Sequence, residues 1–144
     1  MIDIALQINN EVDTFLNSTS PKINWDNIPE NGKWSNKEII GHLTDSAHVN
    51  LQRFVRCTYE DGFKLIYYQD EWVKAQHYKG ADVAELLQLW KLVNRQIARI
   101  LTNYPNDRIS ATCDTSREGV TFNTVEFLAN DYLAHMQHHL NQLK

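Results

Sequence analysis

The chain has 144 residues, of which 42% are hydrophobic and 22% charged, and this composition predicts one globular domain over residues 1–144. The formal net charge is -4 and no run of lysine or arginine occurs, which argues against a nucleic-acid partner because phosphate binding needs a basic patch. The first residues form no basic, apolar leader and no segment is long enough to span a bilayer, so we expect a cytoplasmic protein without a membrane role.

The first half of the chain predicts two helices. Apolar residues recur at helical spacing between residues 5 and 16, in a first amphipathic helix that should stop before Pro21. A second helix is expected after Ser35, because Ser35 with Glu38 three positions later forms the capping box of a helix N-terminus. Its apolar pattern continues to about residue 59.

The second half of the chain predicts two more long helices, separated by long connectors. Residues 60–81 form an aromatic-rich connector with a short helix around Trp72, and Asp82 then opens a long helix that ends before Pro105. A second connector follows, in which alternation over residues 108–113 permits a short strand.

The last helix is expected to be capped by Thr121 or Asn123 and to continue to the end of the chain. Four long amphipathic helices with little strand signal predict an all-α four-helix bundle, with long connectors between helices two and three and between three and four. At least one of these connectors should cross over or cover an open end of the bundle.

The histidines of the second and last helices are the candidate metal ligands. His135 and His139 are four residues apart on an apolar stripe, so their imidazoles lie on one helix face and can hold one ion together. His42 lies on the inward stripe of the second helix and is the candidate third ligand. His138 falls on the most polar face and is expected to be solvated or to lie behind the ligands. For His42 alone, a hydrogen-bonded core residue is the favoured reading, whereas for the pair the two readings are balanced.

Other polar and aromatic residues can complete such a site, and each has a structural alternative. Asp45, three residues after the candidate ligand of the second helix, can orient an imidazole or accept a proton, or be an exposed surface acid. Tyr67, Tyr68 and Trp72 can wall a substrate pocket or simply cover the core. Asn94 can hydrogen-bond in that pocket or lie at the bundle edge. The two cysteines are expected to be free thiols, because neither lies in a paired motif.

Several short motifs occur in a characteristic order along the chain. They are Trp34-Ser35, Gly41-His42-Leu43-Thr44-Asp45-Ser46-Ala47, Tyr68-Gln69-Asp70-Glu71-Trp72, Trp90 with Asn94, and His135-Met136-Gln137-His138-His139-Leu140. Together they resemble the DinB/YfiT-like family over nearly the whole chain. The resemblance implies a four-helix bundle in which His42, His135 and His139 hold a divalent metal with open positions for water. That family includes thiol S-transferases using low-molecular-weight thiols such as bacillithiol or mycothiol, mycothiol-dependent isomerases and metal-dependent hydrolases.

A set of three histidines leaves at least one coordination position free, as in catalytic rather than closed structural zinc sites. We therefore expect a divalent metal, zinc first with nickel, iron or manganese as alternatives, that activates a low-molecular-weight thiol for transfer or water for hydrolysis of a small molecule. The rival interpretations are a non-catalytic bundle that metal stabilises and a dimeric interaction module. A homodimer is expected to pair through an exposed helical face.

Overall fold

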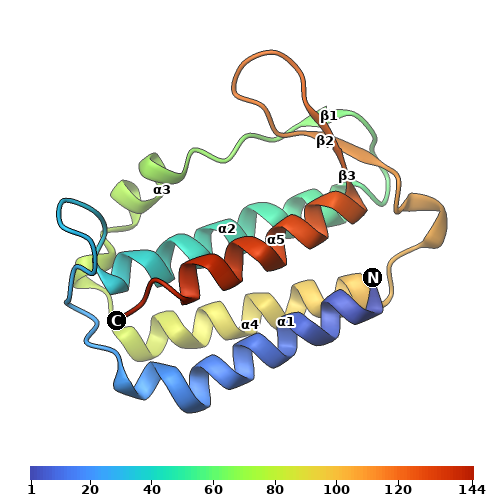
Figure 1. Cartoon of the computed structure of the whole chain (residues 1–144). Coiled ribbons are helices and arrows are strands. Elements are labelled where there is room, and N and C mark those ends of the chain that lie inside the picture. Colours follow the sequence, from blue (N-terminus) through green and yellow to red (C-terminus); the bar gives the residue numbers. More distant parts are fainter.

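Four long helices form a bundle in the computed structural model of the protein, which describes residues 1–144 (Figure 1). They are α1 (Ile2–Thr14), α2 (Asn36–Arg56), α4 (Val83–Thr102) and α5 (Val125–Leu140). The short helix α3 (Gln69–Gln76) lies outside the bundle, in the connector between α2 and α4. A π-helical turn (Phe15–Thr19) extends α1, and single 3-10 turns occur at Ser20–Lys22, Tyr78–Gly80 and Asn106–Arg108. The prediction of a four-helix bundle with two long connectors is confirmed.

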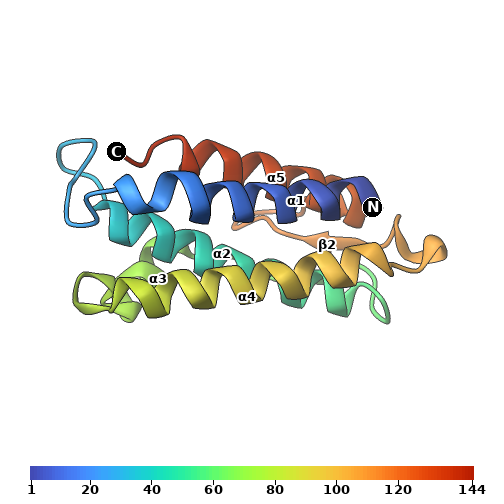
Figure 2. The same cartoon turned by 90° about the horizontal axis from the view of Figure 1, so that it is seen from below.

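The order of the helices around the bundle differs from their order in the chain. α2 packs against α4 and α5, and α1 packs against the same two helices, so α1 and α2 occupy diagonally opposite corners (Figure 1 and Figure 2). The connector from α4 to α5 therefore crosses the bundle from one corner to the opposite one. This arrangement places α2 beside α5, although the two helices are far apart in the sequence.

The two long connectors meet in a small three-stranded sheet. β1 (Phe63–Lys64) belongs to the connector between α2 and α4 and pairs in parallel with β2 (Thr112–Asp114) of the later connector. β2 pairs antiparallel with β3 (Phe122–Thr124), with Cys113 opposite Asn123. The sheet thus joins both connectors above the C-terminal end of α2 (Figure 1).

The helix caps explain where α2, α4 and α5 begin. The predicted caps Ser35 and Asp82 both accept a hydrogen bond from the backbone N–H three residues later. The predicted cap of α5 is wrong, because Thr124 occupies that position in place of Thr121 or Asn123. Asn123 is the middle residue of β3, and its side-chain amide donates to the hydroxyl of Thr115 instead.

A continuous cluster of buried hydrophobic side chains, drawn from all four long helices, fills the bundle. Buried polar side chains are concentrated on one element, α2. They are Asn36, His42, Thr44, Asp45, Ser46, Asn50 and Arg53. Because buried polar groups need hydrogen-bond partners, the segments around α2 must supply partners to these side chains.

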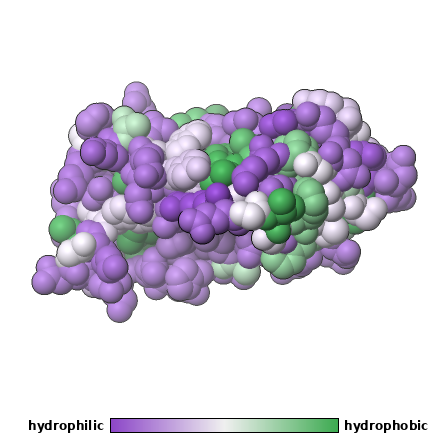
Figure 3. All heavy atoms as spheres, turned by 90° about the horizontal axis from the view of Figure 1, so that it is seen from above, coloured by the Kyte–Doolittle hydropathy of each residue, from purple (hydrophilic) through white to green (hydrophobic).

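The face covered by the connectors is hydrophilic over most of its area, and hydrophobic residues gather toward the end that carries the sheet (Figure 3). Val120 and Phe122, in the hairpin of that sheet, are among the exposed large hydrophobic side chains. None of the helices combines the length and the apolar character that crossing a membrane requires.

Candidate metal centre

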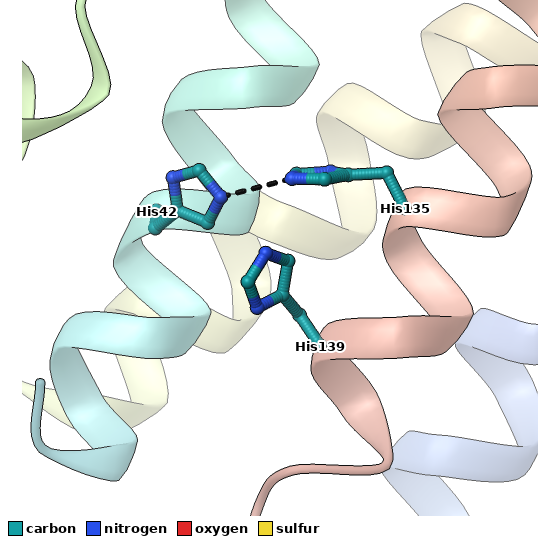
Figure 4. Close-up of side chains that lie close together, drawn as sticks. All are labelled: His42, His135 and His139. Atoms are coloured by element: carbon teal, nitrogen blue, oxygen red, sulfur yellow. Dashed lines mark hydrogen bonds between the residues drawn. The ribbon is translucent and has the colours of Figure 1, made fainter. Parts of the chain in front are cut away.

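His42 of α2 points toward His135 and His139 of α5 where the two helices lie side by side (Figure 4). One ring nitrogen of each residue lies within 4.8 Å of those of the other two. The Nε2 atoms of His42 and His135 are 3.0 Å apart, and the rings of His135 and His139 have their centroids 4.5 Å apart. The structure therefore brings together the three histidines that the sequence singled out.

Ordinary helix geometry positions these side chains. The four-residue spacing of His135 and His139 puts both rings on the face of α5 that looks toward α2. His42 lies in the second turn of α2 among the buried residues Ile40 and Leu43, and its own side chain is fully buried. The capping box at Ser35 fixes where α2 starts and so fixes which face of the helix carries His42.

The cluster disfavours positive charge on its imidazoles. Burial, together with repulsion from His135 and His139, lowers the pKa of His42 to about 3. Burial and the neighbouring His139 and His138 lower the pKa of His135 to about 4, and burial also lowers the pKa of His139. All three rings are therefore neutral at pH 7, which is the form in which imidazole binds a metal ion.

Two of the histidines have a hydrogen-bond partner on the ring nitrogen that faces away from the cluster. Nδ1 of His139 lies 2.7 Å from Oε1 of Gln142, an oxygen that can only accept, so this nitrogen carries the proton and Nε2 keeps a lone pair. Nδ1 of His42 lies 2.9 Å from the hydroxyl of Tyr67. Partners of this kind on the distal nitrogen are typical of histidines that bind metal.

A cleft of about 850 Å³ opens beside the cluster, at the end of the bundle where α5 stops. His139 is the one histidine of the three that lines it, together with Gln142 and Trp34. The Trp34 ring also packs against His42, with centroids 4.9 Å apart. Charged side chains of both signs line the cleft. They are Glu30, Lys33, Glu38, Asp70, Lys79 and Lys144. The cleft suits a polar ligand of small-molecule size.

The aromatic residues proposed as pocket walls lie at different distances from the cluster. Tyr67 stacks on His42, whereas Trp72 packs nearly perpendicular to Tyr67 and lines a separate hollow of about 320 Å³. Tyr68 is 43% exposed, and the guanidinium of Arg117 lies 5.0 Å from its ring centroid. Of these three predicted wall residues, only Tyr67 touches a histidine of the cluster.

Asn94 and Asp45 are both fully buried, in different surroundings. Asn94 lies in the bundle core, where it donates to the carbonyl of Trp90 and accepts from the hydroxyl of Tyr132, and it does not line the cleft. Asp45 is not the exposed acid that the sequence also allowed. Its Oδ1 accepts from Tyr78, its Oδ2 has no hydrogen-bond partner, and burial raises its pKa. It makes no hydrogen bond to a histidine of the cluster, so a catalytic role for Asp45 stays a prediction.

Sequence reasoning did not assign a site role to Gln142, Trp34 or Tyr78. Gln142 lies three residues after His139, a spacing that brings side chains together at the end of a helix, so this contact had a local signal. Trp34 was noted only as part of the Trp34-Ser35 motif at the start of α2. Tyr78 had no signal, because its contact with α2 depends on the path of an irregular connector.

Comparisons with known proteins bear on the fold. The family profile of the DinB superfamily matches residues 10–143 of this chain. No curated protein sequence matches with statistical significance. Among solved structures, YfiT from Bacillus subtilis, described as a probable metal-dependent hydrolase with an unusual four-helix bundle topology, is similar with a TM-score of 0.82 and 17% identity. The match covers 99% of this chain and 81% of YfiT, and at this identity it shows a shared fold.

Proposed function

The chain belongs to the DinB superfamily, and from this membership and the cluster of neutral imidazoles we propose that it is a metal-dependent enzyme acting on a small polar substrate. The observation that carries the proposal is the convergence of His42, His135 and His139 within 4.8 Å beside a cleft. We favour hydrolysis, because the similar structure YfiT is described as a probable metal-dependent hydrolase.

The donor set fits a divalent transition metal. His42, His135 and His139 each offer one neutral ring nitrogen, a donor that suits zinc, nickel, iron and manganese, with zinc the first choice. Three protein ligands leave room for a further one, as in catalytic zinc sites. When bound, the ion supplies Lewis-acid activation of a small nucleophile at neutral pH.

Residues of the cleft supply the surface that binds substrate, and the packing around the histidines limits from which side water and substrate reach the cluster. His42 is closed off from solvent, whereas His139 borders the cleft, so a substrate approaches the cluster from the side of His139. The Trp34 ring covers His42 on the same side of the bundle end. The mixed charges of the cleft can bind polar groups of a substrate and hold its reactive bond near the cluster.

Transfer of a thiol is the second candidate reaction, and it requires a low-molecular-weight thiol. Cys57 and Cys113 are both fully buried, and burial raises the pKa of Cys57 to about 11. Cys57 also caps the C-terminal end of α2, whereas His42 lies near its N-terminal end. Neither cysteine of the chain can therefore serve as a thiolate nucleophile at this cluster.

The metal content of tag-free protein tests the site directly. We expect about one equivalent of a divalent metal per chain, measured by inductively coupled plasma mass spectrometry, and its loss in His42→Ala, His135→Ala and His139→Ala. His138→Ala is the matched control, because His138 is exposed and adjacent to a proposed ligand. Wild-type protein that stays metal-free after reconstitution with zinc, nickel, iron and manganese contradicts the proposal.

The reaction is tested with the metal-loaded protein. We expect hydrolysis of small esters, amides or phosphoesters, or thiol transfer to a small electrophile, that disappears in the His135→Ala, His139→Ala double variant and persists in His138→Ala. A metal that raises the melting temperature while no substrate in such a panel turns over favours the non-catalytic alternative.

A further inference from the structure

Tyr67 contacts His42 through both its ring and its hydroxyl. The two rings are nearly parallel, with an interplanar angle of 9° and centroids 5.7 Å apart. The hydroxyl lies 2.9 Å from Nδ1 of His42 and 3.2 Å from the backbone carbonyl of the same residue, to which it can donate. Tyr67 therefore offers His42 an acceptor on the side away from the cluster.

The two contacts of the Tyr67 hydroxyl determine which ring nitrogen of His42 carries the proton, because His42 is fully buried. A hydroxyl that donates its proton to the His42 carbonyl has its oxygen free to accept from Nδ1–H. With the proton on Nδ1, the lone pair of Nε2 faces His135 and His139, as metal binding requires. No solvent reaches this nitrogen to replace the hydroxyl, so its loss leaves a buried donor unpaired.

Tyr67 belongs to an irregular connector, which buried charged groups of α2 hold on both sides. Before Tyr67, the guanidinium of Arg53 donates from Nε (3.2 Å) and Nη2 (2.7 Å) to the carbonyl of Leu65. After Tyr67, Oδ1 of Asp45 accepts from Gln76 at 3.0 Å and from Tyr78. Burying a charged group is costly in free energy. That two such groups both bind this connector indicates that its position relative to α2 is important.

The end of the connector adopts a backbone conformation that allows Gln76 and Tyr78 to contact Asp45. His77 has a φ of 51°, the left-handed conformation, which lets the residues on either side of it, Gln76 and Tyr78, both turn toward α2. The Tyr78 ring lies on Gly41, where an added Cβ would come within 2.2 Å of a ring carbon. Gly41 immediately precedes the proposed ligand, so the connector is seated on the same turn of α2 that carries it.

We propose that Tyr67 is a positioning residue for the metal centre, which holds His42 with Nε2 toward the ion, and that Arg53 and Asp45 keep Tyr67 in place through Leu65, Gln76 and Tyr78. This inference rests on the proposed function, because it assumes that His42 is a ligand. It assigns the long connector between α2 and α4 a part in building the metal site.

Metal affinity of Tyr67→Phe tests the inference. The dissociation constants for Zn²⁺ and Co²⁺ are measured by chelator competition on the full chain, with Tyr68→Phe as matched control because Tyr68 is exposed and bonds no histidine. We expect Tyr67→Phe to bind both ions about 10–100-fold more weakly than wild type, and Tyr68→Phe to match wild type. The visible spectrum of Co²⁺-loaded Tyr67→Phe should differ from that of wild type, because Nδ1 of His42 has lost its hydrogen-bond partner.

Further measurements separate the outcomes. The melting temperature of each metal-free variant shows whether it folds, and if Tyr67→Phe does not fold, Tyr78→Phe takes its place, because it loosens the connector and leaves the Tyr67 hydroxyl intact. Weaker binding with a changed Co²⁺ spectrum in a folded variant supports the inference. Binding within about two-fold of wild type, with an unchanged spectrum, overturns it and leaves the proposed function standing. Wild-type protein that binds neither ion overturns the proposed function, and the inference with it.

Discussion

The imidazoles of His42 and His135 lie in surroundings that oppose their protonation, and this has a consequence for the stability of the fold. In the unfolded chain histidine takes up a proton near pH 6.5, whereas in the folded chain the pKa of His42 is about 3 and that of His135 about 4. Below pH 6.5 the unfolded state therefore binds more protons than the folded state. The free energy of unfolding is therefore unaffected by these two groups above pH 6.5, and it decreases as the pH falls from 6.5 toward 3.

We predict that the metal-free protein loses unfolding free energy on acidification, on the order of 3 kcal/mol from His42 alone between pH 7 and pH 4. Asp45 opposes this trend, because its pKa is raised and its protonation favours the folded state as the pH falls. Urea unfolding at a series of pH values, with a chelator present, measures the effect. His42→Gln should flatten the profile, and a slope equal to that of wild type would contradict the prediction.

The residues that could be predicted from sequence are those whose neighbours follow from helix geometry. The spacing of His135 and His139 is enough to place them on one face of α5, and a local cap and stripe are enough for His42. The burial of Asp45 and the Tyr67 contact could not be predicted, because their partners lie 33 and 25 positions from α2 residues along an irregular connector.

The helices differ in how strongly local sequence defines their ends. α2 has a complete capping box, in which Ser35 accepts from the Glu38 backbone and the Glu38 side chain accepts from Ser35. The N-terminal turn of α2 also carries Trp34 and leads directly to His42. A change at this cap should therefore weaken the helix that presents a proposed ligand.

We predict that Ser35→Ala destabilises the protein by about 1 kcal/mol, because the Glu38 backbone N–H loses its acceptor and the Glu38 side chain loses the hydrogen bond from the Ser35 hydroxyl. For a chain of this size the melting temperature should fall by roughly 2–4 °C per kcal/mol. Differential scanning calorimetry compares the variant with Ser110→Ala, a control at an exposed serine. A melting temperature equal to that of wild type would show that the capping box contributes nothing measurable.

The sheet and the start of α5 show why other elements were harder to predict. β1 and β2 have two and three residues, too few for an alternating pattern to stand out, and their pairing joins Phe63 to Cys113 across two connectors. Thr124 is both the last residue of β3 and the cap of α5, so the strand ends where the helix begins. Which of three neighbouring polar residues becomes the cap depends on that pairing and not on composition.

The sequence predicts the number of long helices in the bundle, but it does not predict which helices lie next to one another. The α4–α5 crossover, which puts α2 next to α5, follows from how the four apolar faces pack together. Only that arrangement brings His42 to His135, two residues 93 positions apart. An ion bound between them stabilises the folded state alone, since the unfolded chain keeps only the local pair on α5.

We predict that removing metal with a chelator lowers the melting temperature of wild-type protein. Free metal at about 100 times Kd adds roughly 2.7 kcal/mol to the unfolding free energy, so the midpoint should drop by several degrees when it is withdrawn. His42→Ala should melt at the same temperature with and without chelator. A wild-type melting temperature that changes neither with chelator nor with added zinc would contradict metal binding between α2 and α5.

A metal ion bound at the proposed site would also be a removable cross-link, because His42 and His135 lie 93 positions apart in the chain. A disulfide that closes a loop of about 100 residues restricts the unfolded chain by about 4.7 kcal/mol in the chain-entropy account, and a shared ion restricts it in the same sense. Cys57 and Cys113 form no such bridge, so this tether is the kind that a chelator or acid can undo. In the proposed metal-bound state α5 would not separate from α2, and opening of the bundle would wait for the ion to leave.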